Sequence, residues 1–257
     1  EDAVEDKTEE GEAISVTGGH FKWGPKDPTV LKDINLNVKE GSLTAVVGSV
    51  GSGKSSLISA MLGELHKESG RVAVNGKKIA YVPQQAWIQN SPLKENIIFN
   101  LEADEEKYKG VVESCALTTD LAILPAGDQT EIGEKGINLS GGQKQRVSLA
   151  RAVLSNRLGM LLDDTLSAVD PSTEHRILNG LVESRRGRTV IATTHRLSVT
   201  SDADLILVLD QGQVRERGTH EQLVQANGLY ANAWRLQTEE RALKTGGDTT
   251  QGEARSQ

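Results

Sequence analysis

The chain has 257 residues, enough to bury the core of one large domain or two small ones. Hydrophobic residues make up 37% and charged residues 25%, a balance typical of a soluble globular protein. The net charge of −7 argues against a nucleic-acid-binding surface, because phosphate contacts need clustered Lys and Arg.

The first third of the chain is predicted to contain short strands and one helix. Residues 1–13 are acidic and poor in apolar side chains, which predicts a disordered lead-in. Five strands are expected, at Ile14–Thr17, within Thr29–Val38, and at Leu43–Val47, Arg71–Val74 and Lys78–Val82. A helix is expected over Lys54–Leu65, and Asn75-Gly76 is a turn pattern between the last two strands.

The middle of the chain, from Leu93 to Leu154, has a helical pattern. Its single cysteine, Cys115, cannot form an internal disulfide and is expected to be a packing residue. Three apolar runs of strand length then follow, the kind buried on both faces of a parallel sheet, at Leu158–Leu162, Thr189–Thr193 and Leu205–Leu209. Strands that alternate with helices predict an α/β fold.

The strand before residue 48 runs into a complete phosphate-binding loop pattern, Gly48-Ser-Val-Gly-Ser-Gly-Lys54-Ser55. Such glycines let backbone N–H groups turn inward around phosphate oxygens, and the following helix adds its positive N-terminal end. Lys54 is expected to reach the β- and γ-phosphates, and the Ser55 hydroxyl to ligate Mg²⁺. The residues predicted to bind the nucleotide are Gly48, Gly51, Ser52, Gly53, Lys54, Ser55 and Ser56.

A second motif, Leu139-Ser140-Gly141-Gly142-Gln143, follows about ninety residues later and opens a helix. Ser140 can cap that helix, and a serine with two glycines at a helix N-terminus makes an anion site. With the phosphate-binding loop, this signature pentapeptide resembles the ATP-binding cassette of ABC transporters, over roughly Ile14 to Gln237. The resemblance implies that Ser140, Gly141, Gly142 and Gln143 contact ATP bound to a partner cassette.

The resemblance implies a P-loop NTPase core of the α/β class with a mixed sheet and an antiparallel β portion. An inserted α-helical subdomain is expected at about residues 86–155, within a cassette that spans residues 14–243. The polar residues 244–257 are expected to form a mobile, disordered tail. ATP and Mg²⁺ are the implied ligands.

The run Leu161-Leu162-Asp163-Asp164 resembles the strand that carries the metal-binding aspartate of the family. Asp163 is expected to hold Mg²⁺, generally through water. The next position usually carries a glutamate as general base, but here it is Asp164, which is shorter by one methylene. Because a misplacement of about 1 Å can cost on the order of a hundredfold in rate, we predict a slow or silent hydrolytic site.

Two further positions match residues that respond to the γ-phosphate. Gln84, rather than its neighbour Gln85, matches the glutamine that senses Mg²⁺ and the attacking water. His195, which follows a buried strand, matches the switch histidine that hydrogen-bonds the γ-phosphate. The resemblance therefore implies Asp164, His195 and Gln84 as catalytic residues, and Ser55, Gln84 and Asp163 as the Mg²⁺ ligands.

Two other matches each have a structural alternative. Trp23 lies where the family stacks an aromatic ring on adenine, an interaction worth about 1–3 kcal/mol. Trp23 could instead be a core residue, with Phe21 as the stacking ring. Asp170, in Ser167-Ala168-Val169-Asp170, matches the D-loop that crosses the dimer interface, and it would also make a helix N-cap.

The two halves of the chain resemble different branches of the family. Up to about Val153 the chain is similar to the first cassette of multidrug resistance-associated (C-subfamily) exporters, which commonly carry Asp at the base position. The segments that carry this similarity are Tyr81–Asn90, Glu95–Ile98 and Gly133–Gly136. Beyond it, Thr194–Ser198 and Ala203–Gly212 resemble bacterial or B-subfamily exporters. The chain is therefore either a divergent lineage or a hybrid.

The segment Thr130–Gly136 resembles the part of exporter cassettes that contacts membrane-domain coupling helices, although a solvated loop is the alternative. The implied function is the ATPase cassette of a membrane exporter at the cytoplasmic face of the membrane. Its partners would be a second nucleotide-binding domain and the transporter's transmembrane domains, with no nucleic acid. No apolar run approaches the ~18 residues that would span a bilayer.

Two other functions compete with this interpretation. A nucleotide-sensing regulatory domain without catalysis is compatible with Asp164. A self-sufficient soluble ABC ATPase would usually show two cassettes or a long coiled-coil insert, and neither pattern is found in the sequence. Turnover with and without a glutamate at position 164 separates catalysis from sensing.

Overall fold

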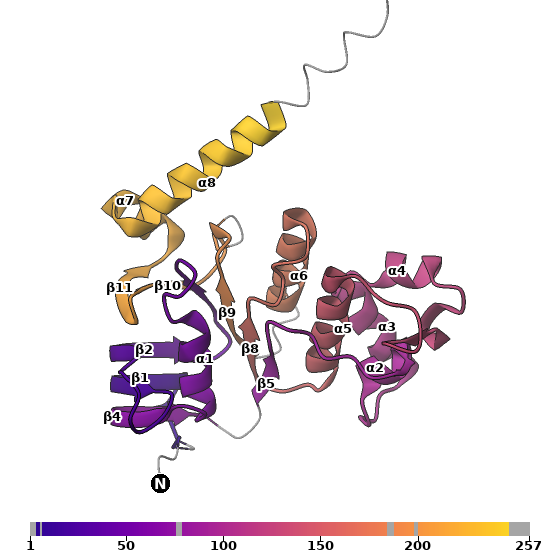
Figure 1. Cartoon of the computed structure of the whole chain (residues 1–257), viewed down its shortest axis with the longest axis horizontal. Helices are drawn as coiled ribbons and strands as arrows, with labels where there is room; N and C mark the ends of the chain where they lie inside the picture. The colour runs from indigo at the N-terminus through magenta and orange to yellow at the C-terminus, as the bar shows by residue number, and fades with distance from the viewer. Residues whose placement is uncertain (1–3, 6, 76–78, 184–187, 198–199, 247–257) are drawn as a thin grey trace, which may run out of the picture.

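A mixed six-stranded sheet forms the centre of the domain in the computed structural model, which describes residues 4–5, 7–75, 79–183, 188–197 and 200–246 (Figure 1). Its strand order is β11-β10-β3-β9-β8-β5, and all neighbours are parallel except β10 and β11. The strands are β3 (Leu43–Val47), β5 (Ile79–Val82), β8 (Gly159–Asp163), β9 (Thr189–Thr194), β10 (Leu205–Asp210) and β11 (Gln213–Gly218).

The central strands are apolar because both faces of the sheet are covered. All five residues of β3 are buried, as are four of the five in β8. Such strands have continuous apolar sequences without the alternation of a half-exposed strand, which is why β3, β8, β9 and β10 could be found from the sequence alone. The parallel order and the intervening helices confirm the predicted α/β class.

A second, antiparallel sheet packs on one side of this core, in the order β2-β1-β4. Its strands are β1 (Glu12–Lys22), β2 (Leu31–Lys39) and β4 (His66–Val74). The first helix, α1 (Lys54–Leu62), contributes Leu57 and Ile58 to an apolar cluster that also contains Phe21 and Val46. The mixed and antiparallel sheets are therefore joined through one shared core, as expected for a P-loop core with an antiparallel portion.

Helix α1 ends three residues earlier than the predicted end at Leu65. Gly63 adopts a left-handed conformation with φ of 77°, and its N–H donates to the carbonyl of Ala60. A glycine just past a helix commonly terminates it in this way, because it adopts positive φ without a Cβ clash. The sequence prediction extended the helix by counting Leu65, which is buried in the core beyond the helix end.

The helices predicted as an insert form a separate group beside the sheet edge at β5 (Figure 1). They are α2 (Leu93–Ile98), α3 (Glu105–Ser114), α4 (Thr118–Ile123), the short 3₁₀ helix η1 (Gly127–Gln129) and α5 (Gly141–Leu154), with a small ladder of β6 (Ser91–Pro92) and β7 (Glu131–Ile132). Cys115 is fully buried here, and burial raises the pKa of its thiol to about 12. That inert environment fits the packing role expected of it.

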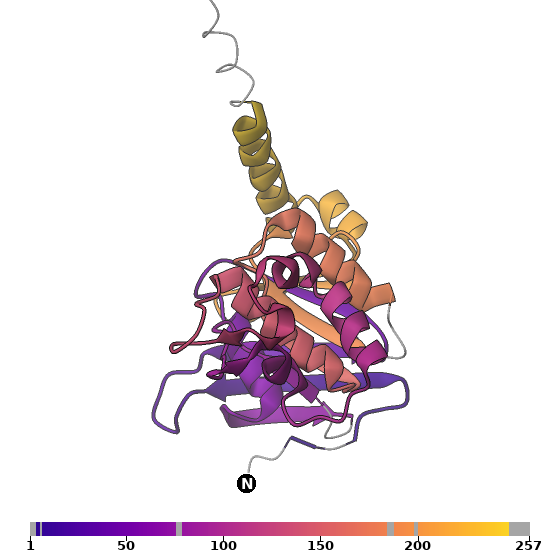
Figure 2. The same cartoon turned by 90° about the vertical axis from the view of Figure 1, so that its right-hand side faces the viewer.

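Three α-helices of the described ranges follow: α6 (Pro171–Glu183), α7 (His220–Ala226) and α8 (Leu229–Gly246). The last of these projects away from the rest of the domain in both views (Figures 1 and 2). The tail was expected to begin at residue 244, but α8 continues to Gly246, and residues 247–257 lie outside the described ranges. Gly76 of the predicted turn and Ser198 also lie outside them.

Part of the acidic lead-in contacts the domain. The backbone N–H of Glu5 donates to the carbonyl of Val72 at 2.9 Å, and its carboxylate pairs with Arg71. The expectation of disorder was based on composition, and composition cannot show that Glu5 pairs with Arg71 of β4. Among the residues that are placed, no helix is both long and apolar enough to cross a membrane.

Candidate functional site

The loop between β3 and α1 adopts a conformation that only glycine allows at several positions. Gly51 and Gly53 have φ of 83° and 107°, a region that L side chains rarely adopt. A Cβ at Gly48 would lie 2.2 Å from the carbonyl oxygen of Leu209. The Ser52 hydroxyl is buried and has no hydrogen-bond partner in the structure. These features suit a loop that wraps a phosphate chain, since a phosphate oxygen would satisfy that hydroxyl.

Lys54 extends its charge over this loop. Its ammonium donates to the carbonyl oxygens of Gly48 and Ser49, both at 2.8 Å. Burial lowers the pKa of Lys54, whereas the nearby carboxylates of Asp164 and Asp163 raise it. The cation is thus held between the phosphate-binding loop and the acidic end of β8, where an anionic phosphate would neutralise it.

Asp163 is buried at the end of β8 and accepts hydrogen bonds from two hydroxyl groups. The Ser55 hydroxyl donates to Asp163 Oδ1 at 3.0 Å, and the Thr193 hydroxyl donates to the same oxygen at 2.8 Å. One carboxylate beside one hydroxyl suits Mg²⁺, which keeps several waters and takes its remaining ligands from substrate phosphates. Within the described ranges no group of three His, Cys, Asp or Glu is placed to hold a metal ion.

Asp164 brings the three residues predicted to be catalytic together. Its Oδ1 lies 3.2 Å from Nδ1 of His195, and its Oδ2 accepts from Nε2 of Gln84 at 3.4 Å. Its backbone N–H donates to the hydroxyl of Thr193 at 2.8 Å. The residue has a left-handed φ of 44°, a conformation that short polar side chains such as Asp tolerate best. The Asp164 carboxylate therefore contacts both Gln84 and His195.

The signature motif opens α5 with a reciprocal cap. The Ser140 hydroxyl accepts from the N–H of Gln143 at 3.2 Å, and the Gln143 side chain accepts from the N–H of Ser140 at 2.8 Å. A Cβ at Gly142 would lie 2.7 Å from the carbonyl oxygen of Ala168, so this glycine lets the helix start approach the D-loop. Ser140 and Gly141 are exposed, whereas Gly142 is buried.

The signature and the phosphate-binding loop lie on different parts of the domain. Figure 1 shows α5 within the helical group, separated from α1 by the sheet strands β5 and β8. Gln143 donates from its amide to Asp120 at 2.8 Å, which ties the signature to α4 of the same group. The exposed start of α5 therefore belongs to the helical group and lies apart from the phosphate-binding loop of its own chain.

Trp23 and Phe21 have opposite environments. Phe21 is only 1% exposed and belongs to the core cluster between the sheets, which excludes it as a stacking ring. Trp23 is 54% exposed at the start of the loop between β1 and β2. That loop ends at Leu31, whose Cδ2 lies within 3.1 Å of a Cβ built at Gly53. Trp23 is therefore a surface ring and not a core residue.

Asp170 caps helix α6. Its Oδ1 accepts from the N–H of Thr173 at 2.9 Å and from the Ser172 hydroxyl at 2.6 Å. These hydrogen bonds hold the pKa of the Asp170 carboxyl well below its usual range. The N-cap alternative considered for this residue is therefore present in the structure, and it also fixes the end of the D-loop.

Sequence reasoning assigned no role to several polar residues that connect the loops of the site. Gln145 donates to the carbonyl of Gln84 at 3.1 Å and accepts from the N–H of Ala168 at 3.3 Å. It therefore links the backbone at Gln84 to the D-loop from within α5. Thr193 binds Asp163 and Asp164, as described above. Gln145 follows the signature motif by two positions, and Thr193 precedes the switch histidine by two. This closeness to the motifs was the only indication of their roles in the sequence.

Arg196, beside the switch histidine, forms a second connection to the D-loop. Its guanidinium donates to the carbonyl oxygens of Ser167 and Val169 and forms an ion pair of 2.9 Å with Glu174. Burial raises the pKa of the Glu174 carboxyl to about 7, although Arg196 opposes that rise. The switch loop (residues 194–197) and the D-loop are thus joined through a charged group that is largely removed from water.

Replacing Glu174 with Gln is expected to remove a pH dependence of stability. Because its folded-state pKa lies above the ordinary 4.5, the folded chain binds this proton more tightly than the unfolded chain. Wild type should therefore lose stability relative to Glu174→Gln as pH rises from about 4.5 to about 7, by at most about 3 kcal/mol. Urea unfolding of both proteins across that range measures the difference, and a constant difference would contradict the assignment.

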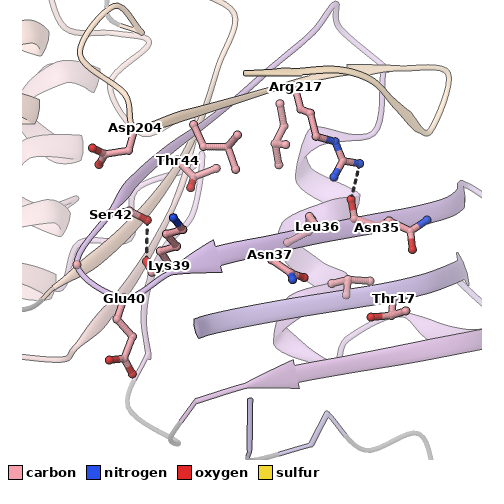
Figure 3. Close-up of a pocket in the computed structure, with 14 residues that line it drawn as sticks. Thr17, Asn35, Leu36, Asn37, Lys39, Glu40, Ser42, Thr44, Asp204 and Arg217 are labelled. Carbon is pink, nitrogen blue, oxygen red and sulfur yellow. Dashed lines mark hydrogen bonds between the residues drawn. The ribbon is translucent and has the colours of Figure 1, made fainter. Parts of the chain in front are cut away.

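A broad cleft of about 890 Å³ lies elsewhere, between the antiparallel sheet and the main sheet (Figure 3). Asn35, Asn37 and Asp204 line it together with Arg217, which donates to the carbonyl of Asn35 at 2.9 Å. None of the residues predicted to bind the nucleotide or the metal lines this cleft. Its size alone is therefore no reason to place the nucleotide there.

Comparisons with a family model and with curated proteins agree on one family. The family model described as ABC transporter matches residues 31–167. The chain is 50% identical over 233 residues to ATP-binding cassette sub-family C member 3 of Rattus norvegicus, covering 89% of this chain and 15% of that protein. It is 51% identical over 227 residues to Multidrug resistance protein mrp-7 of Caenorhabditis elegans, covering 85% of this chain and 15% of that protein.

A solved structure described as a bacterial Atm1-family ABC exporter with ATP bound is also similar. It has a TM-score of 0.83 and 32% identity, and the match covers 91% of this chain and 43% of that one. The chain thus spans about 15% of the length of the curated relatives. The match to the sub-family C protein covers 233 residues, more than the 153 residues that end at Val153. The similarity to sub-family C therefore continues past the position where a change of branch was expected.

Proposed function

The chain belongs to the ABC transporter family, and we propose that it is the ATP-binding cassette of a membrane exporter, acting at the cytoplasmic face of the membrane. In this proposal it binds Mg-ATP and pairs head-to-tail with a second cassette, and closure of the pair moves transmembrane domains outside this chain. The curated relatives, among them a multidrug resistance protein, and the exporter structure support that assignment.

The observation that carries the proposal is the separation of two anion-binding elements on one domain. The phosphate-binding loop precedes α1, while the exposed Ser140 and Gly141 lie at the start of α5, beyond β5 and β8 (Figure 1). A nucleotide on the loop would be out of reach of its own chain's signature. A second cassette in the opposite orientation would bring one signature to each nucleotide, which gives both elements a use.

Within the site, each polar group has a task that its position allows. Loop backbone groups and Lys54 would hold the phosphates, and Ser55 with Asp163 would hold Mg²⁺, which supplies charge neutralisation at the phosphates when bound. Trp23 would stack on the base. Asp164 would act on the attacking water, but it is one methylene shorter than the family's glutamate and is held by Gln84 and His195. We therefore propose slow hydrolysis at this site.

Asp164 also supports a second candidate function, a nucleotide-sensing domain that binds ATP without turning it over. In both proposals the loop binds ATP. They differ in whether the site hydrolyses ATP once a longer carboxylate is supplied at position 164. A self-sufficient soluble ATPase is a weaker candidate, because the curated relatives are sub-family C and multidrug resistance proteins of which this chain matches only a part.

Replacing Ser140 with Asp tests the role of the signature. Aspartate is as good an N-cap as serine, so α5 should stay intact, but its negative charge would face the partner's γ-phosphate. We expect ATP-dependent dimers in wild type by analytical ultracentrifugation at saturating Mg-ATP. In Ser140→Asp we expect at least a tenfold weaker dimer with unchanged ATP affinity for the monomer. The head-to-tail proposal would be contradicted if both proteins dimerised equally. It would also be contradicted if wild type remained entirely monomeric at saturating Mg-ATP.

A further inference from the structure

The switch loop is held by hydrogen bonds to the last helix, α8. The Gln237 side chain on α8 accepts from the backbone N–H of Leu197 at 2.9 Å and donates to the backbone carbonyl of His195 at 2.8 Å. One amide therefore fixes the backbone on both sides of Arg196. Because the His195 imidazole lies 3.2 Å from Asp164, the connection from α8 to the catalytic carboxylate involves only two residues.

A second set of hydrogen bonds ties the same helix to the same loop. The Tyr230 hydroxyl on α8 lies 2.8 Å from the hydroxyl of Thr200, which donates to the carbonyl of Leu197 at 2.7 Å. Both Tyr230 and Thr200 are buried. The backbone N–H of Leu197 is thus held by Gln237 and its carbonyl by Thr200, and both partners depend on α8.

The start of α8 packs against His220, the first residue of α7. His220 lies 2.8 Å from the Tyr230 hydroxyl, and its ring contacts Trp234 with a centroid separation of 4.3 Å. Beyond this aromatic group the helix leaves the domain (Figures 1 and 2), and a cleft of about 550 Å³ lies between it and the switch loop. Gln237 lines that cleft, three residues after Trp234, and so bridges α8 to the loop where the helix begins to project.

From this geometry we infer that Gln237 is a positioning residue that sets the place of the His195 imidazole through the switch-loop backbone, and that α8 is the support of the switch. This inference rests on the proposed function for its catalytic consequence. Its structural part, the dependence of His195 on Gln237, stands independently of hydrolysis. A helix that supports the switch also gives any segment that holds or displaces α8 a route to the nucleotide site.

The test compares Gln237→Ala, Gln237→Glu and wild type. Alanine removes both hydrogen bonds, whereas glutamate keeps the acceptor for the Leu197 N–H but loses the donor to the His195 carbonyl. Gln225→Glu is the matched control, because it makes the same change at an exposed residue of α7. Amide hydrogen exchange of Leu197 reports the first bond, and the imidazole ¹⁵N signals of His195, assigned with His195→Gln, report the position of the ring.

We expect exchange at Leu197 to rise about tenfold in Gln237→Ala and to stay near wild type in Gln237→Glu. The His195 imidazole signals should move in both variants and not in Gln225→Glu. Unmoved imidazole signals in Gln237→Ala would overturn the inference, even if the variant were less stable, because a merely structural residue changes stability and not the ring's surroundings.

A kinetic arm uses the Asp164→Glu background, in which turnover is measurable if the proposed function holds. There, Gln237→Ala should lower kcat about tenfold while Mg-ATP affinity stays within twofold. An unchanged kcat would show that Gln237 does not position the switch for catalysis and would overturn that part of the inference. Absence of any turnover in Asp164→Glu itself would instead contradict the proposed function, and the exchange and imidazole measurements would still decide the role of Gln237.

Discussion

Replacing Asp164 with Glu is expected to raise the rate of ATP hydrolysis by about a hundredfold. The carboxylate of Asp164 is hydrogen-bonded to Gln84 and lies 3.2 Å from His195, and the backbone before it belongs to the buried strand β8. The length of the side chain therefore determines how far the carboxylate extends. One added methylene carries the base toward the water beside the γ-phosphate. Steady-state phosphate release at saturating Mg-ATP measures the gain.

The matched control for this change is Asp164→Asn, which keeps the length of the side chain and removes its charge. It should bind Mg-ATP like wild type and should not gain turnover. Because the residue has a left-handed φ of 44°, the glutamate variant should also lose about 1 kcal/mol of stability, measurable by urea unfolding. Rapid hydrolysis in wild type that does not increase in Asp164→Glu would mean that the aspartate reaches the water.

Replacing Lys54 with Ala is expected to weaken Mg-ATP binding by about a hundredfold, since a charge-assisted hydrogen bond to phosphate contributes about 1.5–3 kcal/mol. In the structure the Lys54 ammonium is already placed over the loop by the carbonyls of Gly48 and Ser49. Little reorganisation is therefore needed when phosphate binds. Fluorescent nucleotide titration, competed with ATP, measures the change.

Lys109→Ala, at an exposed lysine of α3, is the control for this prediction, because it removes the same charge far from the loop. It should bind Mg-ATP as wild type does. Similar affinities for wild type and Lys54→Ala would mean that ATP does not bind at the phosphate-binding loop. That result would contradict both the exporter cassette and the sensing domain.

Much of the fold could be predicted because its signals are local. The central strands are continuous apolar runs, the phosphate-binding loop follows one of them, and Ser140 begins a helix with the residue pattern of a reciprocal cap. The end of α1 was missed because Leu65 suggested one more helical turn, whereas the left-handed Gly63 had already ended the helix. Gly63, two residues before Leu65, was the available signal that the helix ends there.

The connections between loops could not be predicted, because each joins residues far apart in sequence without a pattern of its own. Gln145 reaches Gln84 across 61 positions and Gln237 reaches His195 across 42. The roles assigned to the motif residues came from the family resemblance and stay predictions, although the structure brings Asp164, Gln84 and His195 into contact. The polar residues between the motifs, among them Thr193, emerge only from the folded chain.

The most direct test of the central claim, that this cassette holds Mg-ATP and hydrolyses it slowly, is a single-turnover experiment with the chain in excess over radiolabelled ATP. The account predicts that the nucleotide is bound in the presence of Mg²⁺ and is recovered as ATP after times in which an ordinary enzyme, at about 10 turnovers per second, would have consumed it many times over. Recovery of the label as ADP within seconds, or no retention of ATP with Mg²⁺ present, would contradict it.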